Sequence, residues 1–170
     1  ISFSDSIDFD LKNSIIVLAI DINTNQSNKS NYKYINKLLD YIIANSKFKK
    51  NPLVIMSQVK PGFTRNINWP KNLLYYQVET LIFGKAIERA KYPERIIIGT
   101  HEVNQKINSF FIKYLNKFNC PILKMKFEEA ELSKMYINAY LVNDVILTNL
   151  LSSISKKLNL DWSRSSNALK

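Results

Sequence analysis

Lys134 and Asn138 stand four residues apart in the segment EAELSKMYINAYL (residues 129–141), whose apolar residues have helical spacing. This spacing places both polar side chains on one helical face, close to the apolar Leu141 and Val145. Burying an ammonium group is costly unless the group is paired or used. Two interpretations are therefore open. Either the lysine extends to the edge of a helix packed on one side, or the pair serves a ligand.

The charge balance favours an anionic ligand over a metal ion. Lys and Arg number 24 against 14 Asp and Glu, which gives a formal net charge of +10. The basic residues are scattered and form no arginine-rich stripe, so nucleic-acid binding is only an alternative, and a nucleotide suits the charge better. One cysteine, Cys120, and one histidine, His101, can form neither an internal disulfide nor a His/Cys metal cage. We expect no metal, a structural role for the thiol and a surface position for the imidazole.

The termini and apolar runs indicate a protein of the cytoplasm. No apolar run approaches the roughly 18 residues that a membrane span needs. Residues 1–15 lack the basic and apolar regions of a signal peptide. A single cysteine fits a reducing compartment. We therefore expect a cytoplasmic protein with no membrane partner.

Short β-branched runs alternate with helical periods along the chain. This alternation predicts an α/β fold with a doubly wound parallel sheet, in which ligands sit at the carboxyl ends of the strands. A region without Pro or Gly from about residue 128 to residue 158 predicts one long helix. Strands are expected at 15–20, 52–59, 72–77, 95–100 and 121–127, and helices at 32–46, 84–93, 103–117 and 128–158.

Three segments, in order, resemble the UDP-glucose/GDP-mannose dehydrogenase family. SQVKPGFTR (residues 57–65) is similar to the family's S-T-V-x-x-G-T-T-x segment. YQVETLIFGKAIERAKYPERIIIG (76–99) is similar to N-P-E-F-L-x-E-G-x-A-x-x-D-x-x-x-P-x-R-x-x-x-G. The region 128–161 resembles the central helix E-x-A-E-x-x-K-x-x-x-N-A-x-L. The resemblance implies the second half of a Rossmann-like domain in residues 1–127, and a central dimerisation helix in residues 128–170.

The family oxidises C6 of a nucleotide sugar from alcohol to carboxylate with two NAD+, and a cysteine holds the aldehyde as a thiohemiacetal. The resemblance assigns Glu79 the acid/base or water-positioning role, although a solvated carboxylate at a strand end is the alternative. Lys134 and Asn138 match the pair that binds the sugar and stabilises the oxyanion. A fixed cation and an amide donor suit that task. The substrate segment comprises Val78, Glu79, Thr80 and Leu81.

Two departures fall on the cofactor side. Gln58 replaces the threonine of S-T-V, and Ile22 stands where a threonine is usual. They motivate an alternative, a non-catalytic relative that keeps the fold and the dimer helix but not the cofactor chemistry. The family's glycine-rich NAD loop would precede Ile1, and its nucleophilic cysteine would follow Lys170. Residues 1–170 alone are therefore expected to lack dehydrogenase activity, while forming a homodimer through the long helix.

Overall fold

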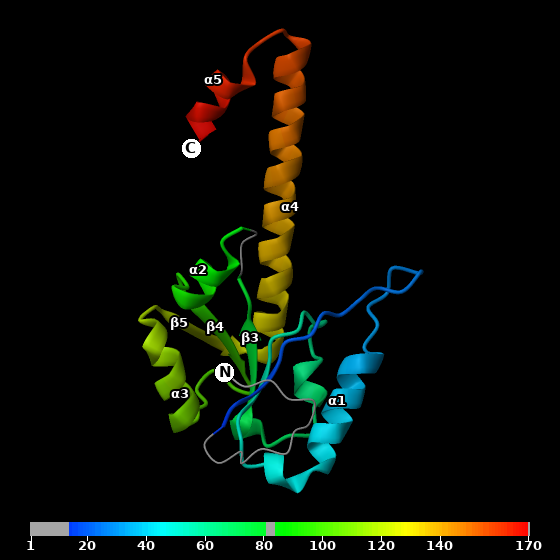
Figure 1. The fold of residues 1–170 in the computed structure, drawn as a ribbon, viewed down its shortest axis with the longest axis vertical. Helices are drawn as coiled ribbons and strands as arrows, with labels where there is room; N and C mark the ends of the chain where they lie inside the picture. The colour runs from blue at the N-terminus through cyan, green and yellow to red at the C-terminus, as the bar shows by residue number, and fades with distance from the viewer. Residues whose placement is uncertain (1–13, 81–83, 170) are drawn as a thin grey trace. The chain divides into compact units, whose positions relative to one another are not determined.

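Five strands form one sheet in the order β1-β2-β3-β4-β5, so that neighbours in the sheet are neighbours in the chain (Figure 1). The computed structural model describes residues 14–80 and 84–169. The strands are β1 (Ile16–Leu18), β2 (Leu53–Ile55), β3 (Leu74–Val78), β4 (Ile96–Thr100) and β5 (Ile122–Lys126). All five lie within the ranges predicted from the sequence or one residue beyond them.

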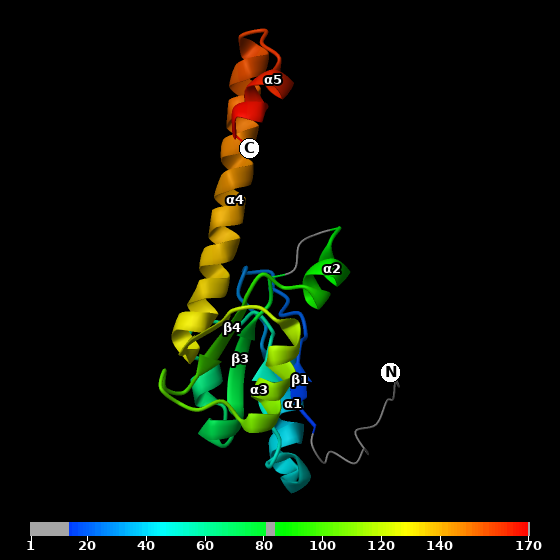
Figure 2. The same cartoon turned by 90° about the vertical axis from the view of Figure 1, so that its left-hand side faces the viewer.

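The sheet is mixed, which corrects the expectation of a wholly parallel one. Strands β1, β2 and β3 are parallel to one another, β3 pairs with β4 in the antiparallel sense, and β4 and β5 are again parallel. The connection from β3 to β4 contains α2 (Ala86–Lys91), which has six residues and is only about 9 Å long. A five-residue strand is about 17 Å long. Helix α2 lies beyond the end of the sheet and does not carry the chain back across it (Figure 2), so β4 begins where β3 ended.

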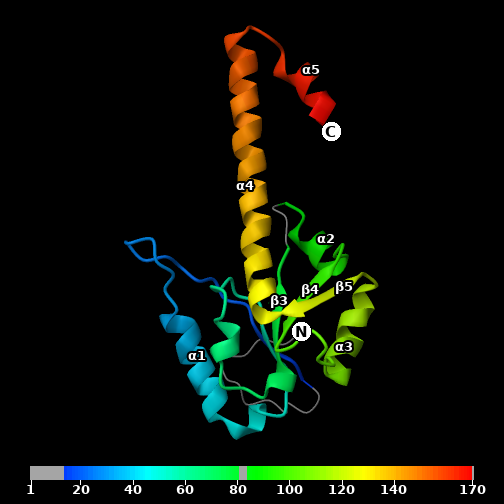
Figure 3. The ribbon, with the colours of Figure 1, turned by 180° about the vertical axis from the view of Figure 1, so that it is seen from behind.

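Two helices cover opposite faces of the sheet, as the front and back views show (Figures 1 and 3). Helix α1 (Lys33–Ala44) buries an apolar stripe on one face, and α3 (Ser109–Leu115) packs on the other. Helix α3 begins six residues later than predicted because the side chain of Asn108 accepts hydrogen bonds from the backbone N–H groups of the first turn. The core cluster beneath α3 comprises Val54, Tyr75, Ile96, Ile98, Phe111 and Leu115. The α/β class is confirmed.

The predicted long helix is α4 (Phe127–Lys157), and its limits agree with the sequence to within one residue. The chain divides into two compact units within this helix, between Lys134 and Met135. The first unit holds the sheet and the first turns of α4, and the second holds the rest of α4 and α5 (Trp162–Ser166). The predicted limits of the two domains, 1–127 and 128–170, stay a prediction. Short 3-10 turns occupy Ser46–Phe48, Thr64–Asn66, Lys71–Leu73, Asn116–Phe118 and Asn167–Leu169.

Within the described ranges, no helix combines the length and the apolar character that crossing a membrane requires. In the second unit, α4 leaves a long series of apolar side chains at least 45% exposed. They are Tyr136, Tyr140, Leu141, Val142, Val145, Ile146, Leu147, Leu150 and Ile154. A helix with so much exposed apolar surface is typical of one that another helix covers.

Candidate active site

The carboxyl ends of β1, β2 and β3 meet at one edge of the sheet because these three strands are parallel neighbours. The hydroxyl of the buried Ser57 ties the first two ends together: it accepts a hydrogen bond from the backbone N–H of Ile20 (3.0 Å) and donates one to the carbonyl of Leu18 (3.5 Å). The segments that carry the two predicted cofactor residues are thus held beside each other. Of those residues, Gln58 is exposed and Ile22 is half-buried.

Lys134 reaches the end of β3. Its ammonium donates a 2.7 Å hydrogen bond to the backbone carbonyl of Glu79, which lies 55 residues earlier in the chain. The half-buried ammonium is therefore paired, which offsets the cost of removing it from water. The structure thus brings together two of the three residues predicted to be catalytic. Asn138 lies one turn further along α4, half-buried, in the second unit.

A cavity of about 370 Å³ adjoins the end of β3. Val78, Glu79 and Thr80 line it, and the fourth residue of the predicted substrate segment, Leu81, lies outside the described residues. Its apolar walls come from β1, β2 and α3. Arg89, which is paired with Glu94, and Arg95 also line it, so the cavity combines apolar surface, a carboxylate and guanidinium groups.

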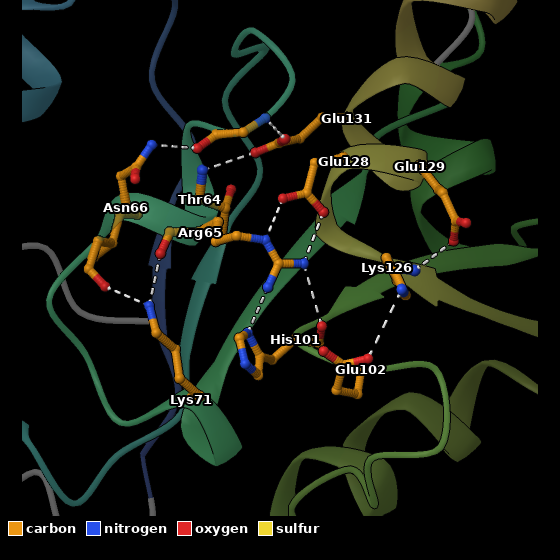
Figure 4. Close-up of polar contacts among 12 residues, drawn as sticks. Thr64, Arg65, Asn66, Lys71, His101, Glu102, Lys126, Glu128, Glu129 and Glu131 are labelled. Atoms are coloured by element: carbon orange, nitrogen blue, oxygen red, sulfur yellow. Dashed lines mark hydrogen bonds and ion pairs between the residues drawn. The ribbon is translucent and has the colours of Figure 1, made fainter.

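The first turn of α4 is anchored to the turn that follows β2. Glu128 accepts two hydrogen bonds from the guanidinium of Arg65, one of them 2.8 Å long, and the two form an ion pair (Figure 4). These bonds from Arg65 hold the pKa of the Glu128 carboxyl below its usual value. Arg65 also stacks on the ring of Phe127, at 5.7 Å from its centroid. This anchor holds the first turn of α4 against the turn that follows β2.

His101, which was expected at the surface, belongs to the same cluster. It is half-buried, and its Nδ1 lies 2.8 Å from Nη1 of Arg65 (Figure 4). Because arginine can only donate, Nδ1 accepts this hydrogen bond, and the ring proton sits on Nε2. The imidazole thus contributes to the contact that anchors α4.

Among the described residues, no group of three or more His, Cys, Asp and Glu side chains could hold a metal ion. Cys120 is half-buried and packs against the core cluster beneath α3.

Glu131 is completely buried, and its role was missed from the sequence, where it appeared only as one position of the family pattern. Its two carboxylate oxygens accept hydrogen bonds from the backbone N–H groups of Gly62 (2.5 Å) and Thr64 (2.8 Å). Burial raises the pKa of this carboxyl, and the hydrogen bonds from Thr64 and Gly62 oppose that rise. The sequence signal that could have identified Glu131 is its spacing of three residues from both Glu128 and Lys134, which places all three on one side of α4.

Comparisons with known proteins identify similar nucleotide-sugar dehydrogenases. A UDP-glucose 6-dehydrogenase of Campylobacter jejuni is 36% identical over 129 residues, which are 74% of this chain and 32% of that protein. A UDP-glucose 6-dehydrogenase of Streptococcus pneumoniae is 27% identical over 118 residues, 64% of this chain and 30% of that protein. The crystal structure of a GDP-mannose dehydrogenase from Pseudomonas aeruginosa matches with a TM-score of 0.73 and 16% identity, over 91% of this chain and 38% of that one. No protein-family model matches the sequence.

This chain spans about a third of the length of the curated relatives it matches. Over the part that it spans, the similarity confirms the resemblance inferred from the three sequence segments. The fold similarity covers the sheet and extends along nearly the whole chain.

Proposed function

We propose that this chain is part of an NAD-dependent nucleotide-sugar dehydrogenase that oxidises C6 of a UDP- or GDP-hexose from alcohol to carboxylate. The observation that supports this most directly is the hydrogen bond from Lys134 to the carbonyl of Glu79. It holds a cation beside a carboxylate-bearing residue at a strand end, in a chain similar to two UDP-glucose 6-dehydrogenases. Strand ends of this kind are where α/β folds bind ligands.

Lys134 and Asn138 would bind the sugar and stabilise the oxyanion that develops at C6. A cation and an amide donor suit the stabilisation of an oxyanion, and these two residues stand four apart in the sequence of α4. Glu79 would move a proton or hold the attacking water, since it is one of the residues that line the cavity at the end of β3. Val78, Thr80 and Leu81 would contact the substrate along the same segment.

The described residues fit one wall of an NAD site. The segments that carry Ile22 and Gln58 are tied together at the carboxyl ends of the strands, where α/β folds bind ligands. A pyrophosphate also needs a glycine-rich turn at a helix N-terminus, and the sequence of this chain contains no such motif. When bound, NAD+ would accept the hydride from C6.

A second copy of the chain is the proposed partner of α4. The exposed apolar series from Tyr136 to Ile154 covers more than one side of the helix, and a twin helix would remove that surface from water. Light scattering of the intact protein at micromolar concentration should give twice the mass of one chain. A monomer at that concentration contradicts the proposed dimer.

The test of function uses the intact protein with NAD+ and three substrates: UDP-glucose, GDP-mannose and a UDP-N-acetylhexosamine. We expect NADH to form with at least one of them, and Lys134→Ala to abolish most of it. Ser133→Ala is the matched control, because the Ser133 hydroxyl bonds elsewhere: to the carbonyl of Glu129 in its own helix (2.8 Å) and, at 3.5 Å, to Sδ of Met125 in β5. Absence of both turnover and NAD+ binding would favour the non-catalytic relative, which the departures at Ile22 and Gln58 motivate.

A further inference from the structure

We propose that Glu131 is a positioning residue that couples the segment following β2 to Lys134 and thereby sets where the ammonium lies at the end of β3. The proposal rests on the function proposed for Lys134. Glu131 itself touches neither a substrate nor a cofactor in this role. It acts by holding the segment that follows β2 and the first turns of α4 in fixed positions relative to each other.

Three charged residues at intervals of three make polar contacts between α4 and other segments of the first unit. Glu128 binds the side chain of Arg65, Glu131 binds the backbone of the Gly62–Thr64 turn, and Lys134 binds the carbonyl of Glu79. Residues three apart lie on the same side of a helix. The three contacts therefore form one line along the first two turns of α4, with Glu131 in the middle, about 4.5 Å along the axis from each neighbour.

Of the two carboxylates in this line, Glu131 is the firmer anchor. It is completely buried, whereas the side chains of Arg65 and Glu128 are 32% and 35% exposed. Exposed ion pairs contribute little because water screens them and both side chains must be ordered. A buried carboxylate with two backbone N–H partners has no water to replace them, so displacing it leaves unpaired polar groups.

The other end of the Glu131 contact lies in the segment that begins with Ser57 and Gln58. The backbone of Gly62 has a φ of +87°, in the left-handed region that favours glycine, and its N–H points to the carboxylate. The Glu131 carboxylate thus holds the Gly62–Thr64 turn, which follows Gln58 in the chain, against the helix that carries Lys134. A displacement of the turn would pass through Glu131 to Lys134, one helical turn away.

The decisive variant is Glu131→Gln in the intact protein. A glutamine has one acceptor oxygen, and its NH₂ group would face a backbone N–H, so one of the two bonds is lost. We expect the reaction of Lys134 with an amine-acetylating reagent to rise about fivefold, measured by mass spectrometry against Lys124 as internal standard. Lys124 is held elsewhere, by the carbonyl of Gln105 at 2.8 Å. We also expect kcat to fall about tenfold or more with the KM for the nucleotide sugar nearly unchanged, since a misplaced group weakens the transition state most.

Two further variants complete the experiment. Ser133→Ala, on the same turn of α4, should leave both the labelling of Lys134 and kcat as in the wild type. Glu131→Asp keeps both acceptor oxygens but is one methylene shorter, so it should give intermediate labelling, and it replaces Glu131→Gln if that variant does not fold. Wild-type labelling of Lys134 in a folded Glu131 variant would overturn the proposal. Labelling needs no turnover, so an inactive wild-type protein would reject the proposed function and leave this measurement decisive.

Discussion

The close approach of α4 to β4 depends on Gly99, and we expect Gly99→Ala to destabilise the protein. A Cβ atom at this position would lie 3.0 Å from Cβ of Ala130, 3.1 Å from Cα of Phe127 and 3.1 Å from Cβ of Tyr76. None of these atoms is the end of a flexible side chain, so the backbone of α4 or of the sheet would have to move. The change therefore acts on the same first turns of α4 that hold Lys134 against β3.

Two effects of opposite sign decide the magnitude. Replacing glycine by alanine lowers the entropy of the unfolded chain, which alone would stabilise the protein by about 0.4–1 kcal/mol. Overpacking a close contact costs about 1–3 kcal/mol. Because three rigid neighbours surround the new methyl group, we expect the second effect to dominate, with a net loss of about 1–2 kcal/mol in the free energy of unfolding. For a chain of this size, that loss lowers Tm by about 3–6 °C.

Urea unfolding of the wild type, Gly99→Ala, Ala130→Gly and the double variant tests this reasoning. Ala130→Gly alone should cost about 1 kcal/mol through helix propensity. In the double variant the closest contact is gone. Its loss of unfolding free energy should therefore be smaller than the sum of the two single losses by at least about 0.5 kcal/mol. A Gly99→Ala protein that is as stable as the wild type, or strictly additive losses, would show that α4 does not press on β4 at this point.

Three further outcomes follow from the contacts of α4 and β3. Lys134→Ala and Asn138→Ala should each reduce turnover about 100-fold or more, with a small change in Tm by calorimetry; unfolding with normal activity per folded molecule would contradict a role in the reaction. Glu79→Gln should lower turnover about 100-fold, while calorimetry should still detect binding of the nucleotide sugar. A turnover rate of this variant equal to that of the wild type between pH 6 and 9 would show that Glu79 is only structural. The hydrogen bond from Arg65 lowers the pKa of Glu128 in the folded protein below the usual value of 4.5. The stability that this pair contributes is therefore fully present above pH 4.5, and it is lost as the pH falls through the lowered pKa. Glu128→Gln should lack that acid-dependent loss in urea unfolding between pH 7 and pH 3.

Elements with a strong local pattern were predictable from the sequence. The limits of α4 were accurate to one residue because its region lacks Pro and Gly and keeps an apolar period. The strands followed from β-branched runs such as IIVLAI (residues 15–20) and RIIIGT (95–100). The start of α3 was placed too early because residues 103–108 are compatible with a helix, and only the hydrogen bonds of Asn108 show where it begins.

The direction of β4 could not be derived in this way. The short helical pattern between β3 and β4 is compatible with either strand direction, and only its position beyond the sheet selects the antiparallel pairing. The partners of Glu131 were equally hidden, since Gly62 precedes it by 69 residues and nothing local in either segment indicates the other. Periodicity identifies the side of a helix that a residue occupies, but not the segment that this side meets.

The burial of Lys134 has a physical explanation that links these contacts. An ammonium at a half-buried position is stable here because the carbonyl of Glu79 accepts its hydrogen bond at 2.7 Å. That pairing restricts the long side chain to a narrow range of rotamers, at an entropic cost of up to about 2 kcal/mol. Glu131 and Glu128 fix the first turns of the helix that carries Lys134. The entropic cost of ordering the lysine side chain therefore arises on folding and not on ligand binding. A cation held in this way at a strand end is in place before a ligand binds, which suits the electrostatic role proposed for Lys134.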